Sequence, residues 1–214
     1  GLLSTEYAKT QSNRINPNQA MSNPSAGNPR LGDDTIYLSV VDKDRNVVSF
    51  INSLFHGFGS GLVAGDTGIL LQNRGAGFSL DPSHANCIAS HKRTMHTIIP
   101  GMIARDGMPL VTFGVMGGQM QPQGHLQLVS NLIDFNMDVQ SALDAPRFRV
   151  MDDGNISLER GISDSISNQL REKKHHIIPP NTFFGGGQAI FVHPEYKTLI
   201  AGSDPRRDGC AVGY

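Results

Sequence analysis

The sequence has little excess charge and no long apolar run, and each shortage weighs against a class of protein. The 18 Lys and Arg residues against 19 Asp and Glu leave a formal net charge of -1 over 214 residues. This balance gives no indication of a nucleic-acid partner. No apolar stretch is long enough to predict a membrane span. The hydrophobic share of 38% is that of an ordinary globular protein with one substantial domain.

Cysteine is also scarce, and the histidines lack the spacing of metal ligands. Cys87 and Cys210 match no metal or redox motif; they could pair, but two cysteines do not make a disulfide framework. We interpret the histidines as surface or pocket side chains and not as zinc ligands, namely His91, His96, His125, His175 and His176. We therefore predict neither a metal site nor a cofactor.

Glycine is what the chain has in abundance. Its 24 glycines include four groups, at 57–65, 75–77, 114–118 and 185–187. Glycine supplies positive φ angles and lets a backbone approach a ligand closely. A single group of this kind is usually a plain turn. Several in one domain favour a site lined by main chain.

Residues 1–34 have the composition of a tail or linker. The chain opens with Gly1 and not with Met, and the first residues predict a short helix over 2–9 capped at Ser4. Residues 11–29 are rich in Asn, Pro, Ser and Gly and have few apolar anchors. We interpret this segment as the end of another unit, exposed and tolerant of cleavage.

At Thr35 the polar leader stops and an alternating apolar pattern begins. Residues 35–41 and 47–51 predict the two strands of a hairpin around a turn at 42–46. Cleavage of the Asp34–Thr35 bond would give Thr35 a hydroxyl and a free α-amine, which is a nucleophile with its own base. Such an amine has a pKa of about 7.7–8.0, so part of it is unprotonated near neutral pH and can act as a base. The alternative is a β-branched residue that simply opens a strand.

The remaining pattern predicts an α+β fold, with helices packed on antiparallel sheets. Further strands are predicted at 68–72, 110–113 and 156–159, with a closing hairpin at 189–192 and 199–201. Helical spacing predicts helices at 124–135, 138–143 and 163–174, the last capped at Ser163. Both strands of the first hairpin carry apolar residues on both faces, so we expect that sheet to be covered on two sides.

Six motifs lie in order between residue 35 and the C-terminus. They are LSVVDKD at 38–44, GFGSG at 57–61, GILLQN at 68–73, GG at 117–118, DAPRF at 144–148 and GSDPR at 202–206. Together they resemble the small subunit of the γ-glutamyltranspeptidase family. The resemblance implies an N-terminal-nucleophile hydrolase fold, a four-layer αββα sandwich, made from a precursor that cleaves itself before a threonine.

The resemblance also implies a domain division and a partner. Residues 1–34 correspond to the end of a large subunit, and residues 35–214 to the small, catalytic subunit. The partner is then the large subunit of the same precursor, in a tight heterodimer that could pair again as a heterotetramer.

The resemblance assigns chemistry to individual residues. Thr35 corresponds to the nucleophile, whose hydroxyl attacks first the carbonyl of Asp34 and later a substrate amide. The backbone amides of Gly117 and Gly118 correspond to oxyanion donors, although the two glycines taken alone favour a tight turn after the strand at 110–113. Ser53 falls where the family keeps a second hydroxyl beside the nucleophile; a polar residue at a strand end is the alternative.

The chain departs from the family where the substrate's amino acid is held. The family's Asn-Gln-x-x-Asp segment, which binds a free α-amino group, is here Asn73-Arg74-Gly75-Ala76-Gly77. The serine pair that takes the α-carboxylate corresponds to His96 and Thr97, and an asparagine two residues past Ser53 is Phe55. A buried ammonium without a carboxylate partner is costly, so we expect a free γ-glutamyl amine to bind poorly.

Arg74 favours an anionic acyl group, such as a dicarboxylic half-amide or an interior γ-glutamyl unit of a polymer; a solvated loop charge is the alternative. The pattern is nearer to the cephalosporin- or glutaryl-acylase-like and capsule-depolymerase-like branch than to the glutathione-cleaving branch. The sequence thus predicts a self-processing hydrolase or acyltransferase for a small-molecule or peptide amide. A true glutathione hydrolase and an unprocessed, inactive binding subunit are the alternatives.

Overall fold

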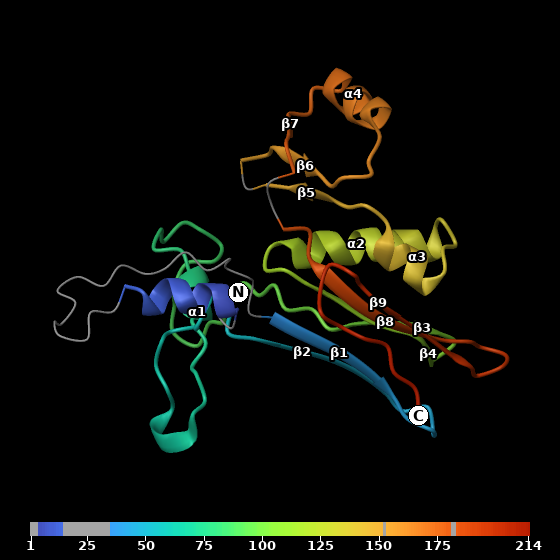
Figure 1. The fold of residues 1–214 in the computed structure, drawn as a ribbon, viewed down its shortest axis with the longest axis horizontal. Coiled ribbons are helices and arrows are strands. Elements are labelled where there is room, and N and C mark those ends of the chain that lie inside the picture. Colours follow the sequence, from blue (N-terminus) through green and yellow to red (C-terminus); the bar gives the residue numbers. More distant parts are fainter. Residues whose placement is uncertain (1–3, 15–34, 152, 181–182) are drawn as a thin grey trace.

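The computed structural model describes residues 4–14, 35–151, 153–180 and 183–214. Its α-helices are α1 (Thr5–Ser12), α2 (Met120–Ile133), α3 (Val139–Asp144) and α4 (Asp164–Glu172), and two short 3-10 helices are η1 (Gly65–Thr67) and η2 (Arg74–Gly77). Its strands are β1 (Thr35–Val41), β2 (Val47–Ser53), β3 (Gly101–Arg105), β4 (Met108–Met116), β5 (Phe148–Val150), β6 (Ile156–Leu158), β7 (Ile177–Ile178), β8 (Gly186–Val192) and β9 (Leu199–Ser203). Helices and sheets are both present, which confirms the α+β prediction (Figure 1).

A four-stranded antiparallel sheet in the order β3-β4-β8-β9 forms the centre of the molecule. Its long strand β4 is buried at every position from residue 110 to 116. A strand that is buried on both faces needs a covering layer on each side. β4 leads directly into the glycine turn at 117–118, so this well-packed strand positions one candidate part of the site.

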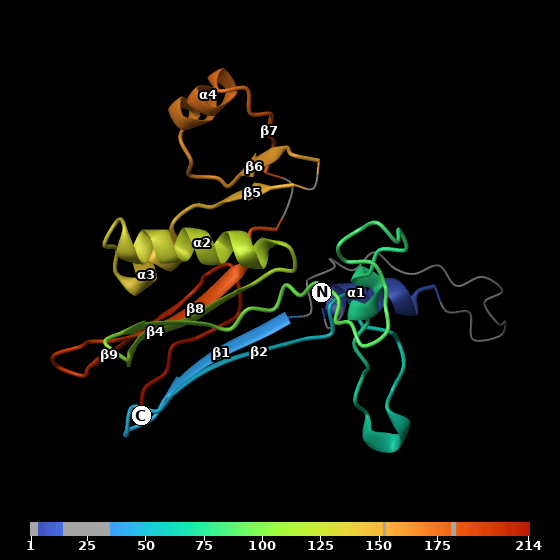
Figure 2. The same ribbon diagram turned by 180° about the vertical axis from the view of Figure 1, so that it is seen from behind.

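α2 and α3 cover one face of the central sheet, and the β1–β2 hairpin lies on the other (Figures 1 and 2). The core between helices and sheet consists of Leu110, Val111, Phe113, Val115, Leu128, Val139, Ala142, Leu143 and Ala189. α2 begins four residues before its predicted start, because Pro122 fits a first helical turn, where N–H groups have no helical partner. Helix, sheet and hairpin make three layers of the expected sandwich.

The predicted first hairpin is confirmed, with Thr35 paired to Ser53 at one end. On its inner face the Tyr37 ring lies against Gly114, where any Cβ would collide with the ring. Its outer face is 41–62% exposed at the apolar residues Ile36, Leu38, Val40, Val48 and Phe50. The expectation that this sheet is covered on two sides is therefore wrong for the described chain.

Several short elements differ from the sequence prediction. Residues 68–72 form no strand, because they fold back onto the preceding loop and make only one bridge, between Val63 and Leu70. β3, β5 and β7 are three short strands that the sequence pattern did not predict. β7 also pairs in parallel with β6, so the sheets are not all antiparallel.

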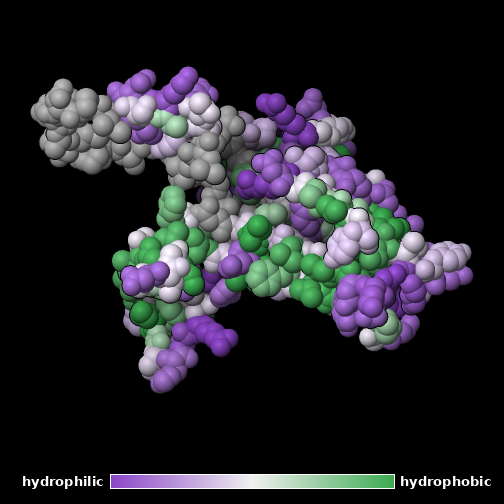
Figure 3. All heavy atoms as spheres, turned by 60° about the horizontal axis from the view of Figure 1, so that its bottom comes forward, coloured by the Kyte–Doolittle hydropathy of each residue, from purple (hydrophilic) through white to green (hydrophobic). Residues whose placement is uncertain are grey.

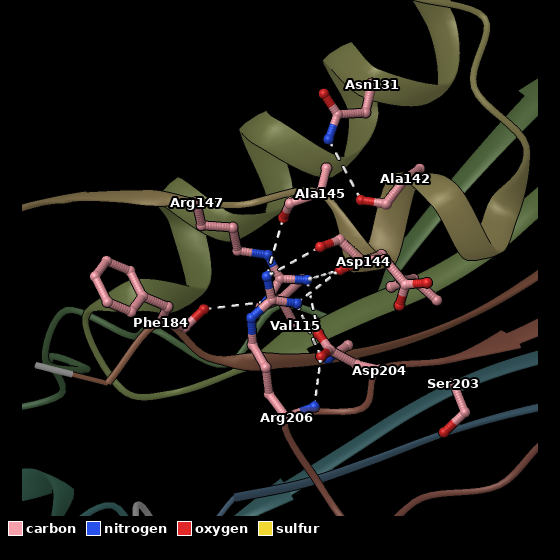
Figure 4. A network of polar contacts seen from close by, with 12 residues as sticks. Val115, Asn131, Ala142, Asp144, Ala145, Arg147, Phe184, Ser203, Asp204 and Arg206 are labelled. Atoms are coloured by element: carbon pink, nitrogen blue, oxygen red, sulfur yellow. Dashed lines mark hydrogen bonds and ion pairs between the residues drawn. The ribbon is translucent and has the colours of Figure 1, made fainter. Parts of the chain in front are cut away.

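A buried polar network holds the C-terminal segment on the core (Figure 4). The Asp204 carboxylate is fully buried and pairs with Arg147 at 2.7 Å and Arg206 at 3.0 Å. Arg206 pairs in addition with Glu159 at 2.6 Å, and Arg147 donates to the carbonyl of Phe184 at 3.0 Å. The DAPRF motif at 144–148 and the GSDPR motif at 202–206 therefore meet at one ion-pair cluster.

Candidate active site

Thr35 and Ser53 place two hydroxyl groups side by side at one end of the hairpin. The strand register pairs the first residue of β1 with the last residue of β2. The Thr35 hydroxyl donates to Ser53 Oγ at 2.9 Å, and the same oxygen accepts the Phe55 N–H at 3.0 Å. Thr35 is 9% exposed. Asp34, the other half of the predicted cleavage bond, lies outside the described residues.

Gly117 and Gly118 form the turn between β4 and α2. Their φ angles of +132° and +54° fall where side chains are rarely tolerated. A Cβ on Gly117 would lie 3.0 Å from the Cα of Gly185. Their carbonyls accept the N–H groups of Met120 and Gln121 at 2.9 Å and 3.1 Å, which closes the start of α2. The backbone N–H groups of such a glycine turn are candidate donors to an oxyanion.

Tyr37 connects the hairpin to the strand that carries this turn, and its role was not predicted from the sequence. The residue is 3% exposed, and its ring packs on Gly114. Its hydroxyl lies within hydrogen-bond distance of three others, at 2.7 Å from Ser39, 2.8 Å from Ser49 and 3.2 Å from Thr112. Tyr37 is close in sequence to Thr35, and Gly114 is close to Gly117. The packing of the Tyr37 ring on Gly114 therefore helps to set the distance between the Thr35 hydroxyl and the glycine turn.

Arg74 begins the 3-10 helix η2 and is buried beside Phe55, whereas arginines are mostly exposed. It is 5% exposed, and its guanidinium carbon lies 4.6 Å from the centre of the Phe55 ring. One guanidinium nitrogen donates to Thr97 Oγ1 at 3.2 Å. Burial lowers the pKa of Arg74. Within the described ranges none of the ion pairs includes this residue. Such a buried guanidinium does not fit the alternative of a solvated loop charge.

Of the other predicted substrate residues, Thr97 and His96 lie near the Arg74 guanidinium, whereas Asn73 has a structural role. Thr97 is 4% exposed and contacts Arg74 directly. Burial, followed by the positive charges of Arg74 and Arg93, lowers the pKa of His96, so its neutral form predominates near neutral pH. Asn73 instead supports the loop, because its side-chain oxygen accepts the His56 N–H at 3.1 Å.

His125 corrects one of the histidine predictions. It is 8% exposed on α2, and its Nε2 accepts the Val115 N–H at 3.0 Å. Burial lowers its pKa to about 4. It is thus a core residue and not a surface or pocket side chain. A buried position on a helix that packs against a sheet could have been inferred from its place in the predicted apolar helix.

The described part of the chain offers no clear site for a metal ion. It contains no group of three or more His, Cys, Asp or Glu side chains with suitable geometry. Cys87 and Cys210 are both free thiols. Within the same ranges, none of the helices has the length and apolar character needed to cross a bilayer.

A hydroxyl pair at the start of β1, a glycine turn at the end of the neighbouring strand β4 and a helix–sheet–sheet layering are features of an N-terminal-nucleophile type of architecture. Comparison with known proteins agrees, because residues 1–214 match the profile of the family described as gamma-glutamyltranspeptidase. The chain therefore belongs to the γ-glutamyltranspeptidase family.

Three relatives illustrate the breadth of this family. The glutathione hydrolase-like YwrD proenzyme of Bacillus subtilis (strain 168) is 38% identical over 99% of this chain and 41% of its own length. The oxamate amidohydrolase proenzyme of Klebsiella pneumoniae is 36% identical over 91% of this chain and 38% of its own length. The crystal structure of cephalosporin acylase from Bacillus halodurans matches with a TM-score of 0.79 and 41% identity, over 100% of this chain and 39% of that one.

The chain thus spans about two fifths of the length of these relatives. The structural match confirms the predicted N-terminal-nucleophile hydrolase fold.

Proposed function

We propose that the protein is a self-processing amide hydrolase or acyltransferase with Thr35 as its nucleophile. The observation that carries this proposal is the 2.9 Å contact between the Thr35 and Ser53 hydroxyls at the first residue of β1. Family membership supports the chemistry. The Bacillus and Klebsiella relatives are both named as proenzymes, which supports maturation by cleavage.

Maturation starts with attack of the Thr35 hydroxyl oxygen on the carbonyl carbon of Asp34. The peptide C–N bond breaks, the acyl group moves to oxygen as an ester, and the nitrogen gains the hydroxyl proton. Water then hydrolyses this ester, which leaves a carboxylate on Asp34 and a free amine on Thr35. Residues 1–34 would then end the large subunit, and residues 35–214 would form the small one.

In the mature protein the Thr35 amine accepts the proton of its own hydroxyl as the oxygen attacks a substrate amide. The Ser53 hydroxyl orients the nucleophile. When the tetrahedral intermediate collapses, the amide C–N bond breaks and the proton passes to the leaving amine. Water or an acceptor amine then resolves the Thr35 ester. We assign oxyanion stabilisation to the N–H groups of Gly117 and Gly118, at about 2.7–4 kcal/mol for each donor.

We also propose that the partner of this chain is the large subunit of the same precursor. Most of the length of the relatives lies outside the segment matched by this chain. Figure 3 views the molecule from the hairpin side and shows apolar side chains gathered on that face. Contiguous exposed apolar surface marks an interface. A heterodimer is the basic unit on this proposal, and a heterotetramer would contain two such units.

The acyl specificity is shifted away from a free γ-glutamyl amino acid. The family's acidic position is occupied by Gly77, which has no carboxylate to offer, and a Cβ there would make a tight contact of 3.1 Å with Thr94 Oγ1. The buried Arg74 offers donors to an anion instead. The name of the Klebsiella relative refers to oxamate, an amide that itself carries a carboxylate. These observations together support an anionic acyl group.

The nucleophile is tested on the full precursor, with large and small segments together. Thr35→Ala should remain one chain and show no amide hydrolysis, because it lacks the attacking oxygen. Thr35→Ser is the matched control and should still self-cleave. Intact-mass measurement decides the outcome: a small fragment that starts at residue 35 is expected for the wild type. An alanine variant that still splits at this bond would overturn the assignment.

The shifted specificity is tested with two anilides that release the same chromophore. The wild type should hydrolyse glutaryl 4-nitroanilide with a higher kcat/KM than γ-glutamyl 4-nitroanilide, because only the latter brings an unpaired ammonium. The reverse preference would support a glutathione hydrolase. A precursor that stays uncleaved and hydrolyses neither compound would support an inactive binding subunit.

A further inference from the structure

Phe55 has a backbone conformation that bulky residues rarely adopt. Its φ angle is +79°, in the left-handed region that favours glycine or asparagine. Strained residues of this kind persist where the surroundings hold them, and they gather at functional sites. Phe55 lies two positions after Ser53, at the exit of the strand that ends beside Thr35.

Four contacts hold Phe55 and its neighbours Leu54 and His56 in this conformation. Its N–H donates to Ser53 Oγ at 3.0 Å, and its ring stacks on His56 with centroids 3.9 Å apart. The Asn73 N–H donates to the carbonyl of Leu54 at 3.1 Å. The side-chain oxygen of Asn73 accepts the His56 N–H at 3.1 Å. The strained turn is therefore tied on one side to the hydroxyl pair and on the other to the loop that carries Arg74.

The aromatic ring faces the guanidinium of Arg74. The distance of 4.6 Å from Cζ to the ring centroid is that of a cation–π contact. A guanidinium that lies over an aromatic ring still has its N–H groups available for hydrogen bonds in the guanidinium plane. Thr97 takes one of these donors, and in the described part of the chain no carboxylate pairs with the group. The other N–H groups of the Arg74 guanidinium are therefore held in place, and no described carboxylate balances their positive charge.

We propose that Phe55 is a positioning residue that selects the acyl group. Its ring fixes the plane of the Arg74 guanidinium, so that the free N–H edge receives the carboxylate of an acyl chain bound to Thr35. The strained turn couples this anion subsite to the nucleophile through Ser53. The inference rests on the function proposed above, and it adds a specificity role for an apolar side chain.

The test uses the self-processed protein, complete with its large subunit, and two substrates of equal chain length. Glutaryl 4-nitroanilide ends in a carboxylate, and pentanoyl 4-nitroanilide ends in a methyl group. The measured quantity is the ratio of their kcat/KM values. Phe55→Leu should lower this ratio at least tenfold, mainly through a higher KM for the glutaryl compound. Phe55→Tyr keeps the ring and should retain the ratio.

Two further variants separate positioning from loss of structure. Phe58→Leu is the matched control, because Phe58 lies on the same loop but is 62% exposed, and the ratio should not change. Arg74→Gln leaves the strained turn intact and should lower the ratio as much as Phe55→Leu. The double variant should lower it no further, because both substitutions disable one subsite.

The outcomes distinguish this inference from the proposed function. An unchanged ratio in Phe55→Leu, an equal fall in Phe58→Leu, or additive losses in the double variant would overturn the positioning role. If Phe55→Leu does not self-process, the Arg74→Gln variant alone tests the anion subsite. An equal fall in kcat/KM for both anilides would then refute this subsite. Failure of the wild type to hydrolyse either anilide would count against the proposed function instead.

Discussion

Replacement of Asp204 by alanine should destabilise the protein strongly. Its carboxylate lies 2.7 Å from Arg147 and 3.0 Å from Arg206, and it also accepts the Gly187 N–H at 2.9 Å. Arg147 is 2% exposed, and burial lowers its pKa while the charge of Asp204 opposes that shift. Alanine would leave this cation buried and poorly compensated. Breaking a buried pair in this way costs about 3–5 kcal/mol, a large part of the roughly 5–15 kcal/mol that stabilises a domain.

Urea unfolding of the whole self-processed protein, followed by circular dichroism, measures this loss. Asp66→Ala is the matched control: it removes the same charge from an exposed position in the short 3-10 helix η1 and should change the unfolding free energy by less than about 0.5 kcal/mol. If Asp204→Ala is not cleaved, its precursor is compared with the Thr35→Ala precursor. An Asp204→Ala value within about 0.5 kcal/mol of its reference would refute the reasoning.

Two more predictions concern the nucleophile and the core. Ser53→Ala removes one hydrogen bond to Thr35, worth about 0.5–1.5 kcal/mol, so kcat on glutaryl 4-nitroanilide should fall about two- to tenfold; an unchanged kcat would contradict its orienting role. Burial lowers the pKa of His125 from its usual 6.5 to about 4. The unfolded chain therefore binds more protons between these values, and about 3 kcal/mol of stability should be lost as the pH falls from 6.5 to 4. His125→Gln should flatten the pH profile of the urea midpoint; an equally steep profile would exclude His125 as the cause.

The elements that sequence reasoning located correctly are those with strong local patterns. The first hairpin follows from period-two alternation around a polar turn, and α4 follows from helical spacing after its cap at Ser163. The loop between residues 54 and 100 has no such period. Its shape depends on contacts between distant residues, such as the Asn73 N–H with the Leu54 carbonyl. The predicted strand at 68–72 failed for this reason.

For the candidate site too, the sequence predicted some properties and the structure alone revealed others. The chemical types were visible in the sequence: a threonine at a compositional break, a glycine pair, and an arginine in place of a glutamine. Their surroundings were not. Sequence patterns did not show that Phe55 turns with positive φ to place its ring over Arg74, or that Tyr37 packs on Gly114.

By itself, the sequence determined the order of the motifs, the α+β class and the residue at which a nucleophile could be made. These properties depend on neighbours in the chain, where backbone preference and hydrophobic period act. Only the tertiary structure decided which groups meet. The strand register brings Ser53 to Thr35, and the packing of separate segments buries Arg74 with no carboxylate partner among the described residues and leaves the hairpin's outer face exposed. Burial and charge pairing involve segments distant in the sequence, so local pattern alone does not specify them.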